Sequence, residues 1–236
     1  MKNNELLIFI PTYNEKGNVE NIYKDITTLG IPLDILFIDD NSADGTGEVL
    51  DNLVSSHDNI SVIHRKSKLG IGSAHLEGVN YAYRENYQIL ITMDCDYTHH
   101  PLDIPRFLEL SKGIDVVVGS RFLQPNSIKG WGFIRVFLTH FGHLLTTHML
   151  NIPFDASGAF RLYNIKNIKL DLFNMVESKG YAFFFESLYF LSRRNLIIKE
   201  VSITLHKRHY GQSKMKVKDM FSGFLQLLRL YVKSVF

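Results

Sequence analysis

The chain has one cysteine, no long hydrophobic run and no excess of either charge. Since Cys95 is the sole cysteine of 236 residues, no disulfide can form within the chain, and a reducing compartment is expected. No stretch reaches the roughly 18 uninterrupted apolar residues of a spanning helix, and the polar start lacks a secretory signal. Lys and Arg number 26 against 24 Asp and Glu, which gives no support to a nucleic-acid partner. We expect a cytoplasmic protein, peripheral on the cytosolic face of a membrane.

The length and the 45% hydrophobic share suffice for one large core. In the first half, short apolar runs alternate with helical patterns, which is typical of βαβ units. The expected strands are 6–11, 34–38, 60–63, 89–93 and 115–119, and the expected helices are 18–29, 45–55, 72–85 and 104–111. The sequence therefore predicts an α/β fold with a mostly parallel central sheet.

The second half is less regular. Helical patterns cover 131–150, 183–194 and 217–236, and a strand is expected at 196–204. The last pattern is apolar over a wide arc, which predicts a helix at a membrane interface, a helix packed on a partner, or one docked on its own domain. Residues 193–218 hold eight Lys and Arg against Glu200, a pattern that favours phosphates or an anionic membrane surface. We expect a catalytic domain at 1–214 and an amphipathic, membrane-interfacial helix in 215–236.

Two acids one residue apart, Asp94 and Asp96, follow the apolar run 89–93. The carboxyl end of a buried strand is where ligands collect in open α/β sheets. Such a pair suits Mg²⁺ or Mn²⁺, with water and ligand phosphates as further ligands, although it is also compatible with two solvated loop acids. His99 and His100 come next, but adjacent histidines point in different directions, which disfavours a zinc site.

Further loops should lie at the same edge of the sheet. Tyr13, in the loop 11–15, offers an aromatic face to a nucleobase. The acids of 39–44 suit hydrogen bonds to a base or a ribose, and they suit a turn and a helix cap equally. Glycines and lysines in 66–74, at a helix start, favour an anion, but the dinucleotide and phosphate-loop patterns are absent from them.

A set of motifs occurs in a fixed order: PTYNE at 11–15, DDNSADGT at 39–46, KLGIGSA at 68–74, DCDYTHHP at 94–101, GSRF at 119–122, SGAFRLY at 157–163 and RHYGQSK at 208–214. As a set they resemble the family 2 glycosyltransferases, and within them the dolichol- or polyprenol-phosphate mannose synthases, from about residue 6 to residue 220. The resemblance implies a GT-A (nucleotide-diphospho-sugar transferase, Rossmann-like) fold. It also implies an enzyme that transfers one sugar with inversion, with GDP-mannose as the expected donor and a polyprenyl or dolichyl phosphate as the acceptor.

The resemblance also implies roles for single residues. The nucleotide sugar would be held by Pro11, Tyr13, Glu15, Ile38, Asp40, Asp94, Cys95, Asp96, Arg121, Arg208 and Lys214. A divalent cation, Mg²⁺ or Mn²⁺, would bind Asp94 and Asp96, while Asp96, Arg121 and Arg208 would be catalytic and Arg121 and Arg135 would meet the acceptor phosphate. Such a phosphate is already ionised and needs no base, so Glu186 is expected to have a positioning or structural role.

Alternatives stay open. The donor could be UDP-glucose or another nucleotide sugar, and a glycan hydroxyl as acceptor would make Glu186 the base. A more remote alternative is a non-catalytic, nucleotide-sugar-binding subunit. Departures from the family pattern are Cys95 between the acids, Asn41 in place of a common glycine, and no transmembrane pair after the catalytic region. They leave the donor and the acceptor open, and they suggest a membrane-anchored partner subunit.

Overall fold

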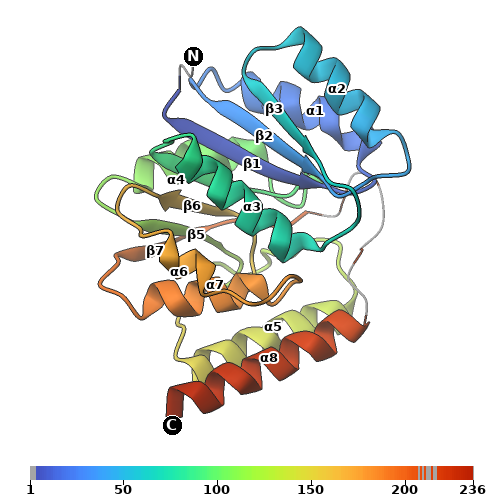
Figure 1. The fold of residues 1–236 in the computed structure, drawn as a ribbon. Helices are drawn as coiled ribbons and strands as arrows, with labels where there is room; N and C mark the ends of the chain where they lie inside the picture. The colour runs from blue at the N-terminus through green and yellow to red at the C-terminus, as the bar shows by residue number, and fades with distance from the viewer. Residues whose placement is uncertain (1–3, 207, 209, 211–213, 215–216, 236) are drawn as a thin grey trace.

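A central sheet of seven strands carries helices on both faces (Figure 1). The computed structural model describes residues 4–206, 208, 210, 214 and 217–235, so Lys207 and Lys216 of the basic segment lie outside the described residues. The strands are β1 (Leu6–Thr12), β2 (Asp34–Asp39), β3 (Ile60–His64), β4 (Ile89–Thr92), β5 (Val116–Ser120), β6 (Arg161–Asn164) and β7 (Ile198–Ser202). Their spatial order is β3-β2-β1-β4-β6-β5-β7, with β6 antiparallel to both neighbours and the other pairs parallel. The predicted α/β class is confirmed.

Helices form a layer on each face of the sheet. They are α1 (Lys16–Thr27), α2 (Thr46–Ser56), α3 (Ile71–Arg84), α4 (Ile104–Leu110), α5 (Phe133–Leu150), α6 (Asp171–Asn174), α7 (Phe183–Ser192) and α8 (Val217–Val235), with a 3₁₀ turn η1 (Pro101–Asp103) before α4. Because side chains alternate along a strand, Leu7 and Phe9 of β1 pack into the cluster with α3 and α7. Ile8 and Ile10 pack into the cluster with α1, α2 and α4.

α5 and α8 lie side by side, outside the layer that contains α7 (Figure 1). Leu227 and Leu230 of α8 are buried and join the main core together with Leu145 and Met149 of α5. The expected boundary at residue 214 stays a prediction, because α8 packs on the rest of the chain and also presents a wide exposed face. None of the described helices combines the length and the apolarity needed to cross a bilayer.

The first five strands begin and end within one residue of the expected positions. β6 and α6, of four residues each, were not predicted. β6 begins at Arg161, a charged residue that is fully buried, so no apolar run announced it.

His75 of α3 is enclosed by aromatic rings. Its ring centroid lies 5.1 Å from that of Phe9 and 4.9 Å from that of Phe184, and its Nε2 has no hydrogen-bond partner among the described residues. Burial, followed by the charge of Arg161, lowers the pKa of His75 from 6.5 to about 3. Between about pH 3 and pH 6.5 the imidazole is therefore mostly neutral in the folded protein but mostly protonated in the unfolded chain.

Replacing His75 with leucine should flatten the acid side of the stability profile. Between the unfolded pKa of 6.5 and the folded pKa of about 3, only the unfolded chain binds the proton, so stability falls as the pH falls. From about pH 6.5 to about pH 5 this linkage should cost the wild type about 2 kcal/mol that the variant does not lose. Urea unfolding at both pH values measures the difference, and equal losses in the two proteins would contradict the assignment.

Candidate active site

The acidic pair stands at the carboxyl edge of the sheet. Met93 donates its backbone N–H to Phe9 O (3.1 Å), which carries the pairing of β4 with β1 up to the turn. Thr98 then donates to Asp96 Oδ1 from its backbone N–H (3.0 Å) and its hydroxyl (2.6 Å). Asp96 is 3% exposed, whereas the Asp94 side chain is 27% exposed. One carboxylate is thus held by the turn, and the other faces the solvent side of the site.

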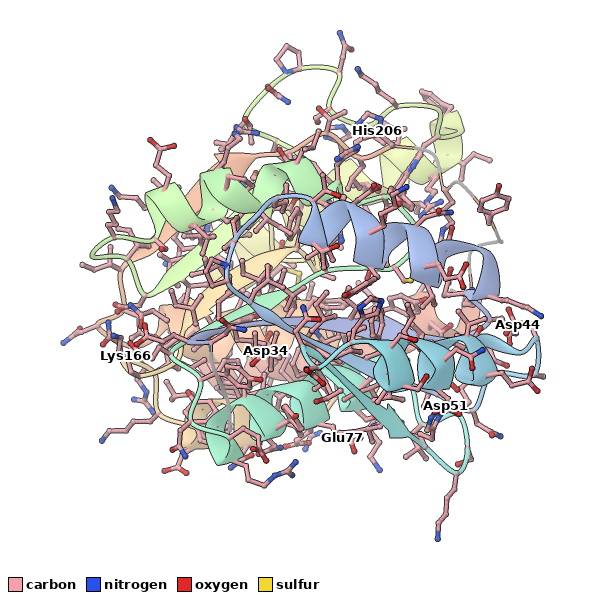
Figure 2. The ribbon with its side chains drawn as sticks, turned by 90° about the horizontal axis from the view of Figure 1, so that it is seen from above. Asp34, Asp44, Asp51, Glu77, Lys166 and His206 are labelled. Atoms are coloured by element: carbon pink, nitrogen blue, oxygen red, sulfur yellow. The ribbon has the colours of Figure 1, made fainter. Side chains whose placement is uncertain are left out.

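Figure 2 shows the molecule from above the view of Figure 1, with this edge of the sheet at the right. Asp44, which follows β2, lies at the opposite end of the view from Lys166, which follows the antiparallel β6. Because β1, β2 and β4 are parallel, the loops that follow them gather at the end marked by Asp44.

Arg208 meets the acidic pair directly. Its guanidinium lies 2.8 Å from Asp96 Oδ2. Burial, and next the charge of Asp96, raise the pKa of Asp94 to about 7, while Arg208 acts in the opposite direction. The site therefore holds two close carboxylates and one contacting guanidinium, and it is electrostatically suited to a further cation.

The two histidines behind the acids have local partners. His99 Nδ1 accepts the Asp94 backbone N–H (3.0 Å), and His100 Nδ1 accepts that of Leu102 (3.2 Å) at the start of η1. Burial lowers the pKa of His99 to about 4, so its imidazole is neutral. Within the described residues no group of three or more His, Cys, Asp and Glu side chains could hold a metal ion.

The loop after β1 carries Tyr13 and Glu15. Glu15 is 8% exposed, and its carboxylate accepts from Lys214 Nζ (2.6 Å) and Asn18 Nδ2 (2.6 Å). Burial raises the pKa of Glu15, and Lys214 opposes that shift. Lys68 Nζ lies 3.7 Å from the centroid of the Tyr13 ring. Lys68 and Lys214 thus bring positive charge to the place where the sequence predicts a nucleotide.

Asp40, after β2, organises the neighbouring loop. Its Oδ1 accepts from Arg65 (3.0 Å) and from the backbone N–H of Leu69 (3.0 Å), and its Oδ2 accepts the N–H of Gly70 (3.1 Å). Ile38, also predicted to meet the nucleoside, is 0% exposed and lies in the core. The structure therefore places Asp40 as the support of the loop that leads into α3, and Ile38 behind it.

Arg65 is a site residue that sequence reasoning missed. Besides Asp40 it contacts Glu77 Oε2 (2.8 Å) and Ser73 Oγ (3.0 Å), both on α3, and Figure 2 shows Glu77 on that helix. No pattern marked Arg65, because its position is not part of a recognisable motif. Lys68, three residues further on, drew attention through the glycines beside it.

Two other predicted residues, Cys95 and Pro11, differ in how far they are exposed. Cys95 is 2% exposed and packs in the core on the α1 side of the sheet, and burial raises the pKa of its thiol. Pro11 is partly exposed near the end of β1. Cys95 therefore stands between the two acids in sequence while its side chain points away from solvent.

Arg121, after β5, forms a buried ion pair. Its Nε and Nη2 contact the two oxygens of Asp155 at 2.7 and 2.5 Å, and Nη2 also donates to Ser157 Oγ (2.5 Å). Burial alone would raise the pKa of Asp155, but Arg121 lowers it. Asp155 was missed by sequence reasoning, although it lies two residues before the SGAFRLY motif. The Arg121 side chain is thereby oriented by a carboxylate rather than left mobile.

Arg135, in the first turn of α5, stacks on Trp131 with 3.4 Å between the guanidinium carbon and the ring centroid. Partial burial and then the charges of Arg208 and Asp96 act on the pKa of Arg135, and the net shift is downward. Arg135 therefore lies within electrostatic reach of Arg208 and of Asp96.

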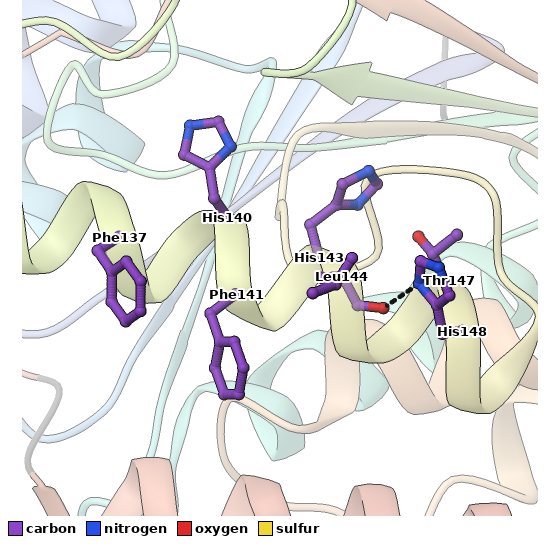
Figure 3. A pocket seen from close by; sticks show the side chains of 7 residues that line it. All are labelled: Phe137, His140, Phe141, His143, Leu144, Thr147 and His148. Carbon is purple, nitrogen blue, oxygen red and sulfur yellow. Dashed lines mark hydrogen bonds between the residues drawn. The ribbon is translucent and has the colours of Figure 1, made fainter.

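Beyond Arg135, α5 carries a shallow pocket of about 470 Å³ (Figure 3). Phe137 and Phe141 point to one side of the helix, and His140 and His143 to the other (Figure 3). The His143 ring stacks on Phe122, with centroids 3.9 Å apart. An apolar surface therefore starts beside the cationic end of the site and continues along α5.

Comparison with known proteins agrees with the family resemblance of the sequence motifs. Residues 7–170 match the model of "Glycosyl transferase family 2". The chain is 33% identical to the polyprenol monophosphomannose synthase of Mycolicibacterium smegmatis, over 89% of this chain and 80% of that protein. It is also 33% identical to the undecaprenyl-phosphate mannosyltransferase of Micrococcus luteus, over 89% and 87%.

Solved structures share the fold at low identity. Glucosyl-3-phosphoglycerate synthase from Mycobacterium tuberculosis superposes with a TM-score of 0.66 and 17% identity, over 98% of this chain and 80% of that one. The mannosyltransferase PcManGT from Pyrobaculum calidifontis, solved with GDP-Man and Mn²⁺, gives 0.55 and 15%, over 98% and 64%. These similarities confirm the GT-A fold. The chain therefore belongs to glycosyl transferase family 2 and is a glycosyltransferase.

Proposed function

We propose that the protein transfers mannose from GDP-mannose to a polyprenyl phosphate, with inversion, at the cytosolic face of a membrane. The observation that carries this proposal is the acidic pair Asp94 and Asp96 with the guanidinium of Arg208 in contact with Asp96. The names of the two 33% identical relatives support mannose and a lipid phosphate. The GDP-Man and Mn²⁺ bound to the Pyrobaculum protein support the donor and the metal.

Asp94 and Asp96 would hold the divalent cation. The fit rests on the donor set, two carboxylates one residue apart that are contacted by the single guanidinium of Arg208 at 2.8 Å from Asp96. Burial, and next the charge of Asp96, raise the pKa of Asp94, which agrees with an incompletely neutralised pair. A bound Mg²⁺ or Mn²⁺ would supply charge neutralisation to the departing diphosphate. Oxygen ligands of this kind suit both ions.

Cationic side chains of the protein would orient the diphosphate of the donor and the phosphate of the acceptor. Lys68 and Lys214, which contact Tyr13 and Glu15, would face the nucleotide. Arg208 would stabilise the negative charge that develops on the departing GDP as the bond between sugar and phosphate breaks. Arg121, held by Asp155, and Arg135 would present the acceptor phosphate, because a guanidinium fork can bind two phosphate oxygens at once.

The lipid part of the acceptor fits the outer surface of α5 and α8. Large exposed apolar side chains there are Phe133, Ile134, Phe137, Phe141, Leu144, Val217, Phe221, Phe224, Leu225 and Val232. Lys218, Arg229 and Lys233 accompany them on α8. Apolar side chains flanked by cations are the composition that beds into an anionic membrane interface. We therefore include peripheral membrane binding through α5 and α8 in the proposal.

A hydroxyl acceptor is the less favoured alternative. It would need Glu186 as the base, yet Glu186 is 1% exposed and both of its oxygens accept hydrogen bonds within the protein. A general base has to reach the proton that it removes. The observed burial therefore supports an acceptor that is already ionised.

Transfer can be tested directly. Purified protein is incubated with Mn²⁺, radiolabelled GDP-mannose and vesicles that contain undecaprenyl phosphate, and label in the organic phase is counted. Organic-phase label that depends on both the metal and the lipid phosphate is expected. Label from UDP-glucose instead would change the donor, and no label from any nucleotide sugar would refute the proposal.

A further inference from the structure

Glu186, near the start of α7, connects α8 to the segment 177–181. Its Oε1 accepts from the backbone N–H of Glu177 (3.1 Å) and from Gln226 Nε2 (2.9 Å), and its Oε2 accepts the N–H of Ser178 (3.0 Å). Gln226 belongs to α8. Hydrogen bonds to a charged, buried acceptor are stronger than those between neutral groups. The three donors therefore fix Glu186, and Glu186 fixes the segment relative to α8.

Two basic side chains on the surface of α8 form ion pairs with the same segment. Arg229 lies 2.5 Å from Glu177 Oε2, and Lys233 Nζ lies 3.6 Å from its Oε1. These ion pairs are half exposed, so each contributes little by itself. The Gln226–Glu186 contact is the sheltered part of the connection.

On its other side, the segment lies against the start of α3. Ser73 donates its backbone N–H to Lys179 O (3.1 Å). A Cβ atom on Gly72 would lie 2.6 Å from Gly180 O, so the two backbones are in close contact. Gly70, where a Cβ atom would lie 2.6 Å from Lys179 O, donates its N–H to Asp40 Oδ2 (3.1 Å), a residue predicted to hold the nucleoside. The segment thus connects α8 to the loop that Asp40 supports, at the predicted donor site.

We propose that Glu186 is a positioning residue that transmits the seating of α8 on a membrane to the donor site. When α8 beds into lipid, Gln226 is held in place, and Glu186 keeps the segment 177–181 on α3 in the arrangement that binds the nucleotide sugar. The inference rests on the proposed function for the donor and for the membrane. By linkage, lipid and donor must each strengthen the binding of the other by the same factor.

The test compares the wild type with Gln226→Leu in the full chain. Affinity for GDP-mannose with Mn²⁺ is measured by calorimetry with and without vesicles of phosphatidylglycerol and phosphatidylcholine. Vesicles should lower the wild-type Kd about fivefold or more, and should leave the Kd of the variant unchanged. On vesicles with acceptor lipid, Gln226→Leu should raise the KM for GDP-mannose and leave kcat near the wild-type value. Thermal unfolding confirms that the variant is folded.

Gln88→Leu is the matched control. Gln88 is also half-buried and also hydrogen-bonded through its side chain, but it precedes β4 at the end of the sheet away from the acids. It should respond to vesicles as the wild type does. The inference would be overturned if vesicles left the wild-type Kd for GDP-mannose unchanged, or if they lowered the Kd of Gln226→Leu by the same factor as that of the wild type.

Hydrogen exchange separates this inference from the proposed function, because it needs no donor. Vesicles should slow exchange at the amides of Glu177 and Ser178 in the wild type and not in Gln226→Leu. If GDP-mannose fails to bind, the proposed function fails, while this exchange pattern still supports the connection. Identical exchange in both proteins refutes it.

Discussion

Replacing Asp96 with asparagine is expected to slow the proposed mannosyl transfer about 100- to 1000-fold at a saturating concentration of the proposed donor, GDP-mannose. This is the usual cost of one lost electrostatic contact in a reaction centre. Asp96 is 3% exposed, held by Thr98 on one oxygen and 2.8 Å from Arg208 on the other. The amide keeps the shape but removes one of the two negative charges proposed to hold the cation. Initial rates at increasing Mn²⁺ concentration measure the loss, and a higher Mn²⁺ requirement should accompany it.

Asp103→Asn provides the matched control. Asp103 lies seven residues further on, where it pairs with the exposed Arg106 at 2.9 Å. Exposed ion pairs contribute about 0–1 kcal/mol, so this variant should transfer mannose at close to the wild-type rate. If Asp96→Asn retained more than about a tenth of wild-type activity, with an unchanged Mn²⁺ requirement, the central role of the acidic pair would be refuted.

The strands that lead to the site could be predicted because their apolar runs are local. Residues 89–93 gave both the place of β4 and the edge at which Asp94 and Asp96 emerge. Parallel neighbours, β1 and β2, then bring Glu15 and Asp40 to the same edge by topology alone. The resemblance to the family added residues such as Arg208 that lie far away in the sequence.

The partners of those residues could not be predicted, because they are formed by tertiary packing. Asp155 meets Arg121 from 34 positions away, and Arg65 reaches Asp40 across 25. Neither contact leaves a periodic signal. The resemblance assigns Ile38 and Cys95 to the nucleotide sugar, and these two roles stay predictions. What the sequence did not show is that both side chains are buried in the core.

β6 shows the same limit in the fold itself. Its Arg161 is 0% exposed, and Nη2 donates to the carbonyls of Ala156 and Phe184 at 2.9 Å each. Nη1 donates to Ser187 Oγ at 3.1 Å. None of the described carboxylates forms an ion pair with Arg161. One buried guanidinium therefore joins the loop before β6 to the first turn of α7, the helix that carries Glu186.

Arg161→Met should lower the free energy of unfolding by about 1–3 kcal/mol, because it leaves the buried Ala156 carbonyl without its donor. The Phe184 carbonyl loses one of its donors but keeps the Ser187 hydroxyl (3.1 Å). Methionine fills similar space, so the loss reports hydrogen bonds more than a cavity. Arg106→Met, at an exposed arginine of α4, should change stability by no more than about 0.5 kcal/mol. Urea unfolding followed by circular dichroism measures both variants. Equal stability of Arg161→Met and Arg106→Met would contradict this prediction. It would mean that the free-energy cost of burying the Arg161 charge cancels the contribution of its hydrogen bonds, and that other contacts hold β6 to α7.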